Sequence, residues 1–529
     1  MIYFIISLIV WFIFLGMKLK TGLHMLQQNL YNGNNRYIKW TFKNYKKVFL
    51  NIDLLLLIYT IFLLLVDNII LSSILFNIIL IACILKYYEE MKNDKLKEKK
   101  PLVVTSRIKR LIITLGIIIL IPIVSMFINY NDIYLNSNYI KLTVLSYLSY
   151  YLLLLVNVIN KPVEKYVYYS FKRKALKKLH SMNNLDVVGI TGSYGKTSSK
   201  NIVSDILNIK LNALPTPRNL NTPYGLIMTI NNHLTKFDDI MIAEMGAYKI
   251  GEIKELCDLV KPKYGILTKI GVAHLETFGS EENIVKAKFE LIEELPQDGV
   301  AILNKDDDKQ VKYKIKNKCK KIWIGIDKKC DYQAKNIKMN NLGSTFEVEI
   351  NKKNIKFETK LLGMANIYNI LSGIALGIHF GLSTEELQRA VKGVKQVEHR
   401  LELKPNGNIT YIDDAYNSNP VGSKMAVEVL GMMPGTKVIV TPGMIELGEK
   451  QYEYNKLFGE YIADVCDHTI LVGEKQTKPI YDGLMSKKYD KNKIYIINDV
   501  KEAFVIVNKM KKKQIYVLLE NDLPDLFNE

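Results

Sequence analysis

The sequence predicts a helical membrane domain followed by an α/β protein, in which a central domain with a phosphate loop (P-loop) precedes a Rossmann-like, doubly wound domain. Three observations support this. Long apolar runs fill the first 160 residues, a glycine-rich turn follows a short strand at Leu185–Lys200, and strands alternate with helices again from Ile409. We therefore divide the 529 residues into a membrane domain at 1–160, a basic linker at 161–180, a central domain at 181–395 and a last domain at 396–529.

Five apolar runs near the N-terminus are each close to the length needed to cross a bilayer. The first lacks a basic residue before it and a small-residue cleavage pattern after it, so we interpret it as an uncleaved anchor rather than a signal peptide. The Asp67-Asn68 break separates the second and third runs into a hairpin. The runs are Ile2–Gly16, Phe49–Val66, Ile69–Tyr87, Leu111–Tyr130 and Tyr139–Ile159.

The orientation of these spans follows from Lys and Arg in the loops. Residues 18–47, 86–110 and 161–178 are rich in Lys and Arg, whereas 67–68 and 130–138 contain neither. Because basic loops face the cytoplasm, five spans with the N-terminus outside satisfy the whole pattern. This predicts a multi-pass plasma-membrane protein with cytoplasmic soluble domains, and basic loops that hold anionic membrane lipids.

Charged side chains within the runs are few. Asp53 and Lys141 both lie near the ends of their runs, where we expect them to reach the interface. A transport path would need ionisable groups at mid-depth, so the pattern favours anchoring over transport.

The composition excludes some other classes. A net charge of +19 suggests nucleic acid or an anionic surface, but Asn, Ile, Lys and Tyr are abundant throughout, so a compositional bias explains the charge and we expect no nucleic-acid partner. The five cysteines show no C-x-x-C spacing, which argues against a disulfide framework or a zinc site.

The stretch Leu185–Lys200 carries the clearest chemistry. A β-branched run is followed by the turn Thr191–Thr197 and by a segment compatible with a helix. Glycines in such a turn let backbone N–H groups surround a phosphate at the positive end of the helix. The turn supplies Gly192, Ser193, Gly195, Lys196, Thr197 and Ser198. Lys196 can reach the outer phosphates and Thr197 can bind magnesium, so we expect a nucleoside triphosphate site rather than an ordinary strand-to-helix turn.

The rest of the soluble part reads as further strands and helices. Glu244 follows the buried strand Ile240–Ala243, where a carboxylate beside a phosphate loop can hold a metal ion. His274 follows the strand Tyr264–Thr268, although a lone histidine there is more often structural. Leu214–Gly225 reads as an ordered loop and Trp323–Lys360 as an antiparallel insert. We expect later strands at Ile409–Ile412, Lys437–Val440, Thr469–Val472, Lys493–Ile497 and Gln514–Leu519.

The order of these motifs resembles the Mur ligase family, the ATP-dependent amide ligases of peptidoglycan precursor synthesis. The matching pieces extend from about Leu185 to Leu519 and are Thr191–Thr197, Asn219–Asn221 with Pro223 and Gly225, Glu244–Gly246, Ala273–Leu275 with Phe278–Ser280, Ala287-Lys288, Asn304, Asn366, Arg400–Glu402 and Asp413–Pro420. Ala273–Leu275, Asp413–Pro420 and Met444–Gly448 are most similar to the members that add D-alanyl-D-alanine to UDP-MurNAc-tripeptide.

The resemblance implies that ATP activates a carboxylate as an acyl phosphate, which an amine then attacks. Lys196, Glu244, His274 and Lys288 are then catalytic, with Thr197, Glu244 and His274 as magnesium ligands and Lys288 carbamylated. ATP contacts would also come from Asn304, Asn366, Arg400 and Asp414, the last two after closure of the last domain. Substrate contacts would come from Asn219, Asn221, Tyr416, Asn417 and Asn419. The implied partners are a nucleotide-sugar or lipid-linked peptide and an amino acid or dipeptide.

The chain departs from the family pattern in three places. Membrane spans stand where typical members have a soluble UDP-binding domain, Ala365 replaces a usual histidine, and Leu519–Asp522 replaces a Lys-Gly-Ser-Arg segment. Three alternatives therefore stay open: a membrane-anchored ligase for another polymer, of the poly-γ-glutamate type; an ATP-hydrolysing transporter or sensor; and a nucleotide-binding anchor without enzymatic activity.

Overall fold

The structure is a computed structural model that describes residues 1–31, 36–65, 68–97, 101–128, 135–272, 275–416, 418–445, 447–510 and 512–522. By internal contacts the chain divides into two compact units, Met1–Tyr169 and Ser170–Glu529. The division lies inside one helix, α9 (Lys161–His180), which overlaps the linker expected at 161–180. The finer boundaries at 160, 180 and 395 stay predictions.

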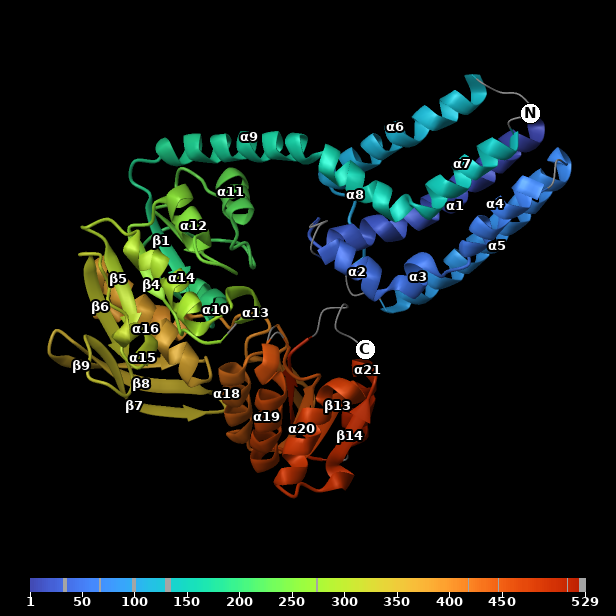
Figure 1. The fold of residues 1–529 in the computed structure, drawn as a ribbon. Helices are drawn as coiled ribbons and strands as arrows, with labels where there is room; N and C mark the ends of the chain where they lie inside the picture. The colour runs from blue at the N-terminus through green and yellow to red at the C-terminus, as the bar shows by residue number, and fades with distance from the viewer. Residues whose placement is uncertain are drawn as a thin grey trace. The chain divides into compact units, whose positions relative to one another are not determined.

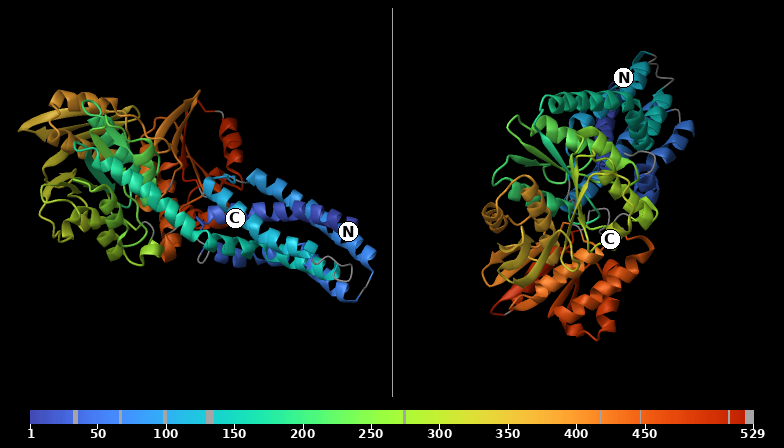
Figure 2. Two further views of the ribbon diagram at one scale, coloured as in Figure 1. Left: turned by 90° about the horizontal axis from the view of Figure 1, so that it is seen from above. Right: turned by 90° about the vertical axis from the view of Figure 1, so that its left-hand side faces the viewer.

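The first unit is helical (Figure 1). Apolar helices run alongside one another within it, as the further views in Figure 2 show. Aromatic side chains such as Trp11, Phe76 and Tyr139 fill its interior. Its helices are α1 (Ile2–Gln28), α2 (Ile38–Lys43), α3 (Tyr45–Phe49), α4 (Leu54–Leu65), α5 (Ile69–Lys97), α6 (Ser106–Ile128), α7 (Leu135–Tyr147), α8 (Ser149–Ile159) and the first half of α9.

Four helical segments in the described residues are long and apolar enough to cross a membrane: Ile2–Gln28, Tyr45–Leu65, Ile70–Lys92 and Ser106–Ile128. The fifth expected span, Tyr139–Ile159, corresponds to α7 and α8, which are bent by 70° at Leu148. The total reaches five if the bent pair is one span. The first helix also continues twelve residues beyond Gly16, so the basic segment expected to begin at Lys18 is partly helical.

The expectation that Asp53 reaches the interface is wrong. Asp53 and Lys18 form an ion pair with both side chains fully buried, and Lys18 Nζ also donates to the Ser146 carbonyl at 2.9 Å. Lys18 lies near the rings of Tyr147 and Tyr150, at 5.7 and 5.3 Å from their centroids. The helices therefore bury charge after all, but as a neutral pair, because an unpaired charge in an apolar interior is costly.

Breaking this pair should destabilise the helical unit. We expect Lys18→Met to lower the unfolding free energy by about 3 kcal/mol, because it leaves the Asp53 carboxylate buried without its counter-charge. The double variant Lys18→Met/Asp53→Leu should recover most of that loss. Thermal unfolding of the detergent-solubilised chain measures both, and a double variant no more stable than Lys18→Met would contradict the expectation.

The second unit contains two sheets. The first has nine strands in the order β2-β3-β1-β4-β5-β6-β7-β8-β9. Neighbouring strands are parallel from β2 to β7, and β7-β8 and β8-β9 are antiparallel. The strands are β1 (Asp186–Thr191), β2 (Ala213–Pro215), β3 (Ile240–Glu244), β4 (Tyr264–Leu267), β5 (Val300–Asn304), β6 (Lys320–Gly325), β7 (Tyr332–Asn340), β8 (Gly343–Ile350) and β9 (Lys353–Thr359).

Helices cover both faces of this sheet, as a parallel sheet requires. The helices α10, α16 and α17 pack on one face. On the other face α14 lies against β1 and β4, where Gly189 and Gly265 leave room for its Leu291 side chain. The helices of this domain are α10 (Lys196–Leu207), α11 (Pro223–Asn232), α12 (Glu252–Val260), α13 (Leu275–Phe278), α14 (Glu281–Glu293), α15 (Asp308–Lys312), α16 (Met364–His379) and α17 (Thr384–Gly393).

The second sheet has the order β10-β11-β15-β12-β13-β14 and is parallel except for β10. Helices α18, α19 and α20 pack on one face and α21 on the other. Its elements are β10 (Glu402–Asn406), β11 (Ile409–Asp414), α18 (Pro420–Gly431), β12 (Thr436–Thr441), η3 (Gly448–Lys450), α19 (Gln451–Val465), β13 (His468–Val472), α20 (Glu474–Ser486), η4 (Lys491–Lys493), β14 (Ile494–Ile497), α21 (Val500–Lys509) and β15 (Ile515–Glu520).

The predicted fold class is confirmed, with local corrections. The antiparallel insert is present, but Trp323–Gly325 belong to the parallel strand β6. The expected loop Leu214–Gly225 is shorter, because Leu214 and Pro215 form an edge strand and Pro223 begins a helix. Proline is tolerated at both places: an edge strand and the first helical turn need no N–H donor there. The antiparallel strand β10 was not predicted.

Candidate active site

The turn after β1 has the geometry of an anion cradle. Gly192 has φ +150° and Gly195 has φ +81° at the N-cap of α10. Thr268 anchors the turn, because its hydroxyl donates to the Tyr194 carbonyl at 2.7 Å. A Cβ at Gly192 would lie 1.9 Å from the Thr268 hydroxyl oxygen. Only glycine fits at Gly192, and the N-terminus of α10 is left facing the space where a phosphate can bind.

Lys196 is held against the turn. Its ammonium donates to the Gly192 carbonyl at 2.7 Å and to the Ser193 carbonyl at 3.2 Å. Burial lowers the pKa of Lys196 from its ordinary value, opposed by nearby Glu244 and reinforced by Arg400. An anionic ligand would favour the charged form, because phosphate charge offsets the desolvation of the ammonium.

Glu244 is the centre of a buried polar cluster. Its Oε1 accepts from the Thr197 hydroxyl at 3.2 Å and from Asn221 Nδ2 at 3.0 Å. Its Oε2 pairs with Lys200 Nζ at 3.0 Å, with both side chains almost fully buried. The predicted ligands Thr197 and Glu244 are therefore adjacent, and two hard oxygen donors at this spacing suit a magnesium ion.

A pocket lies beside this cluster. It is lined by Lys196, Lys288 and Tyr248 together with Gly192, Ser193, Asn221, Gly246 and Ala247. Lys288 projects from α14. Its Nζ lies 3.5 Å from the Ala247 carbonyl oxygen and 5.4 Å from the centroid of the Phe278 ring. Burial, reinforced by the charge of Lys196, lowers the pKa of Lys288 to about 7. The amine is therefore substantially neutral near neutral pH.

The last domain contributes a second group of predicted residues. The Arg400 guanidinium stacks on the Tyr416 ring at 4.5 Å, and the Tyr416 hydroxyl hydrogen-bonds Asn219 of the central domain. Asp414 ends β11 and accepts from the Leu401 backbone N–H at 3.2 Å. Residues of both domains thus meet at one place.

The remaining predicted residues make local contacts or lie outside the described residues. Asn304 Oδ1 accepts from the Asp306 backbone at 2.9 Å, and Asn366 Nδ2 donates to the Leu362 carbonyl at 2.8 Å. Asn419 is the N-cap of α18, and its side chain accepts from Gly422. Ser198 is buried in the first turn of α10. His274, the expected magnesium ligand, and Asn417, an expected substrate contact, lie outside the described residues.

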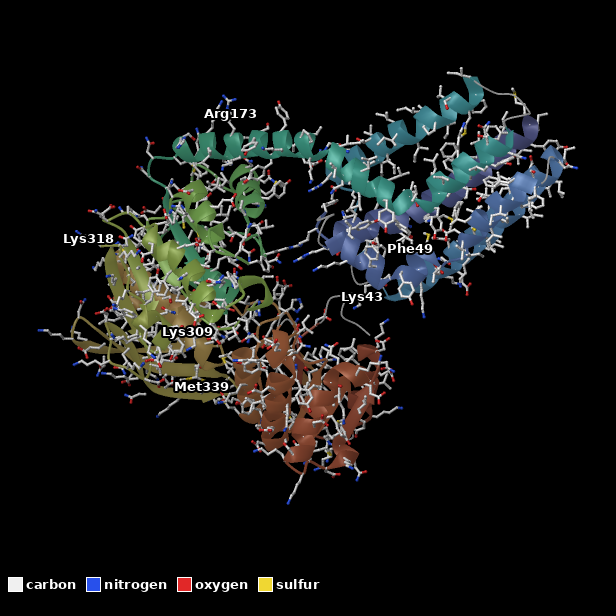
Figure 3. The ribbon with its side chains drawn as sticks, viewed as in Figure 1. Lys43, Phe49, Arg173, Lys309, Lys318 and Met339 are labelled. Carbon is white, nitrogen blue, oxygen red and sulfur yellow. The ribbon has the colours of Figure 1, made fainter. Side chains whose placement is uncertain are left out.

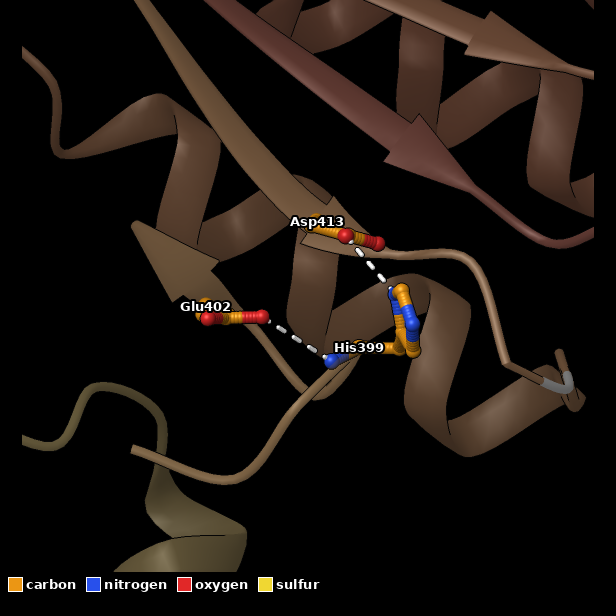
Figure 4. Close-up of side chains that lie close together, drawn as sticks. All are labelled: His399, Glu402 and Asp413. Atoms are coloured by element: carbon orange, nitrogen blue, oxygen red, sulfur yellow. Dashed lines mark hydrogen bonds and ion pairs between the residues drawn. The ribbon is translucent and has the colours of Figure 1, made fainter. Parts of the chain in front are cut away.

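A group of titratable side chains next to Arg400 resembles a metal site at first sight. His399, Glu402 and Asp413 lie close together, with His399 Nδ1 2.8 Å from Asp413 Oδ2 (Figure 4). However, Lys404 Nζ already lies 3.0 Å from Glu402 and 2.5 Å from Asp413. Lys404 therefore already pairs with both carboxylates, and we interpret the group as an ion-pair network that orders the segment around Arg400.

A second carboxylate lies beside Asp414. Glu520 at the end of β15 is fully buried, and its Oε1 accepts from the Ser418 hydroxyl at 2.6 Å. Burial raises the pKa of Asp414 above its ordinary value, and burial and the adjacent Asp414 raise the pKa of Glu520 well above its ordinary value. The pair therefore holds protons at pH values where both groups are ionised in the unfolded chain.

This predicts a stability that falls as pH rises from about 4 toward neutrality, because the unfolded state loses protons that the buried pair keeps. In Glu520→Gln the side-chain carbonyl can still accept the hydrogen bond from the Ser418 hydroxyl, and the amide is neutral without binding a proton. We expect it to raise the unfolding free energy by about 2 kcal/mol at pH 7.5 and to have little effect near pH 4. Thermal unfolding at the two pH values is the measurement, and an equal effect at both would contradict the prediction.

Sequence reasoning missed three residues of the site. Lys200 lies one helical turn from Lys196 and Thr197, so the 3.6-residue period could have placed it on the same face. Tyr248 and Glu520 carried no local signal, since their places in the site depend on the loop after β3 and on the position of β15 in the second sheet.

The fold and the site define a P-loop nucleotide-binding protein of two α/β domains, in which the second domain supplies an arginine beside the phosphate loop. Residues 190–377 match the Mur ligase middle domain, and residues 399–519 match the Mur ligase glutamate ligase domain.

Relatives extend these two matches. The chain is 30% identical over 341 residues to the UDP-N-acetylmuramoyl-tripeptide–D-alanyl-D-alanine ligase of Bacillus subtilis, covering 63% of this chain and 72% of that protein. It is 33% identical over 293 residues to the same-named ligase of Escherichia coli, covering 55% and 65%. The crystal structure of the MurF ligase from Thermotoga maritima in complex with ADP is 26% identical with a TM-score of 0.59, covering 67% and 80%. The chain belongs to the Mur ligase family.

Proposed function

We propose that this protein is an ATP-dependent, ADP-forming ligase that adds D-alanyl-D-alanine to UDP-MurNAc-tripeptide at the cytoplasmic face of the membrane. The main support for this reaction type is that the phosphate loop Gly192–Thr197 lies beside Glu244. Arg400 of the last domain lies near Lys196 of the same loop. The similarity to ligases named for D-alanyl-D-alanine addition supports the choice of substrates.

The residues have chemical roles that suit this reaction. The substrate carboxylate attacks the γ-phosphorus of ATP and ADP leaves, after which the amine attacks the acyl carbon and phosphate leaves. Lys196 is placed to exchange its carbonyl partners for phosphate oxygens and to stabilise the charge that moves onto ADP. Arg400 reinforces this positive potential. Asn221 fixes the Glu244 carboxylate, while Asn219 holds the Tyr416 hydroxyl near the amine end.

A magnesium ion would be held by Thr197 and Glu244, with His274 as the third proposed ligand. The geometry that fits it is the Thr197 hydroxyl 3.2 Å from Glu244 Oε1. When bound, the ion would neutralise charge on the phosphates.

The proposal is tested by coupled ADP release from the purified full chain. We expect turnover with UDP-MurNAc-tripeptide plus D-alanyl-D-alanine and only background release when either is omitted. A lipid-linked tripeptide tests the alternative acceptor, and glutamate tests the poly-γ-glutamate reading. Steady ATP hydrolysis without any acceptor would instead support the transporter or sensor alternative.

We further propose that the apolar helices cross the plasma membrane and that basic segments hold anionic lipids. The support is the span-like helices and the basic helix α9, on which Arg173 projects outward (Figure 3). In the proposed orientation a cysteine at Asn68 should react from outside the cell with an impermeant maleimide, whereas one at Ser106 should react only after permeabilisation.

Lys288 is proposed to carry a carbamate. The lowered pKa of its buried amine raises the share of the neutral form, which is the form that reacts with CO₂, and the carbamate would place an anion beside Lys196. We expect a carbamate signal in ¹³C NMR after incubation with labelled bicarbonate, lost in Lys288→Ala and retained in Lys286→Ala, which changes an exposed lysine two residues away. The same weak signal in both variants would exclude the modification at Lys288.

A further inference from the structure

Lys200 is a buried lysine that the mechanism above does not use. It is 1% exposed and lies three residues after Thr197 on α10, so both side chains project from one face of the helix. The two side chains bind different oxygens of the Glu244 carboxylate: Thr197 donates to Oε1, and Lys200 pairs with Oε2 at 3.0 Å.

The same ammonium also donates to the carbonyl of Arg218, which has a left-handed backbone with φ +49°. This loop continues to Asn221, whose amide returns to Glu244 Oε1. One lysine therefore joins α10, the end of β3 and the loop before α11. Because Lys200 pairs with Oε2, the other carboxylate oxygen, Oε1, is the one that accepts the hydrogen bond from the Thr197 hydroxyl.

The charges of this arrangement also affect whether a cation can bind. Lys200 already balances the single negative charge of Glu244, and Lys196 adds a further positive charge at the phosphate loop. A divalent cation that approaches without nucleotide would lose hydration in a site of net positive charge, which is unfavourable. A nucleoside triphosphate brings several negative charges and reverses the balance.

We propose that Lys200 is the resident counter-cation of Glu244 and makes divalent-cation binding at Glu244 conditional on bound nucleotide. The inference rests on the proposed function for the identity of the ligands, but concerns cation binding and not ligation. In this arrangement the empty site keeps Glu244 buried and paired at little cost, and the cation enters only together with the phosphates.

The test uses Mn²⁺ as the probe, measured by electron paramagnetic resonance on the full chain in detergent, with and without a non-hydrolysable ATP analogue. The wild-type protein should bind Mn²⁺ weakly alone and much more tightly with the analogue. Lys200→Met should bind Mn²⁺ without nucleotide at least about tenfold more tightly than wild type, because the competing charge is gone. Adding Glu244→Gln to that variant should abolish the gain.

Controls separate charge from folding. Lys286→Met removes an exposed lysine charge elsewhere in the domain and should behave as wild type. Lys200→Arg keeps the charge and should also do so. If Lys200→Met fails to fold, as judged by thermal unfolding, the neutral Lys200→Gln can still bond the Arg218 carbonyl and carries the same expectation.

Mn²⁺ binding by the wild-type protein that is equally tight with and without the analogue would overturn the proposal, as would a folded neutral variant that binds Mn²⁺ no more tightly than wild type. Absence of ADP release with every acceptor would instead count against the proposed function, and leaves the cation measurement interpretable.

Discussion

Lys196→Ala is expected to lower ADP release at least about 10³-fold, because the substitution removes the cation that the structure places at the phosphate loop. The ammonium lies 2.7 Å from the Gly192 carbonyl oxygen, so it needs only a side-chain rotation to reach a bound phosphate. Desolvation already lowers its pKa, and the free energy needed to keep it charged would be recovered when phosphate binds. The measurement is the turnover number in the coupled assay.

Two controls give this result its meaning. Lys286→Ala removes an exposed lysine of the same domain and should retain full turnover. The melting temperature of Lys196→Ala should stay close to that of wild type, since among the described residues the lysine hydrogen-bonds to carbonyls of its own turn alone. A folded variant that keeps more than about a tenth of wild-type turnover would remove Lys196 from the phosphate-transfer step.

Gly192→Ala should have the largest effect on stability. The added Cβ would lie 1.9 Å from the Thr268 hydroxyl oxygen and 3.1 Å from the Thr268 carbonyl carbon, so either the turn or the residue directly after β4 has to move. A non-glycine residue at φ +150° adds backbone strain. Together we expect a loss of about 4 kcal/mol in unfolding free energy and loss of nucleotide binding, measured by thermal unfolding and by equilibrium binding of an ATP analogue.

Gly251→Ala is the matched control for the strain alone. Gly251 has φ +92°, but a Cβ there would meet no atom within 4 Å in the part of the chain that the structure describes. We expect a loss of about 1 kcal/mol with nucleotide binding intact. If the two variants were equally destabilised, the close approach of Gly192 to Thr268 would not be what fixes the phosphate loop.

Local sequence patterns predicted much of the second unit. The order of strand, turn and helix at Asp186–Leu207 could be read directly, because β-branched runs and turn glycines act on the nearest residues. The five strands expected after Ile409 all appear, within one or two residues at each end. The strand β10 was missed since Pro405 and Asn406 are poor strand residues, and its pairing with β11 overrides that preference.

Partners distant in sequence account for what was missed. Lys18 was assigned to a cytoplasmic loop and Asp53 to the interface, yet they pair across 35 residues inside the helical unit. Periodicity could not show this, because a single charge near the end of an apolar run looks the same whether it reaches water or a buried counter-charge. Tyr416 and Asn219 likewise meet only through the contact of two domains.

By itself, the sequence determined the class of this protein: apolar helices before two α/β domains, and a phosphate loop with Lys196, Thr197 and Glu244 in the order of a Mur ligase. Local propensity and motif spacing suffice for that. Only the tertiary structure decided that Lys200 reaches Glu244 across 44 residues, that Lys288 is buried beside Lys196, and that Glu520 lies against Asp414. The physical reason is that burial and charge pairing depend on which strands and helices become neighbours, and no short stretch of sequence specifies that.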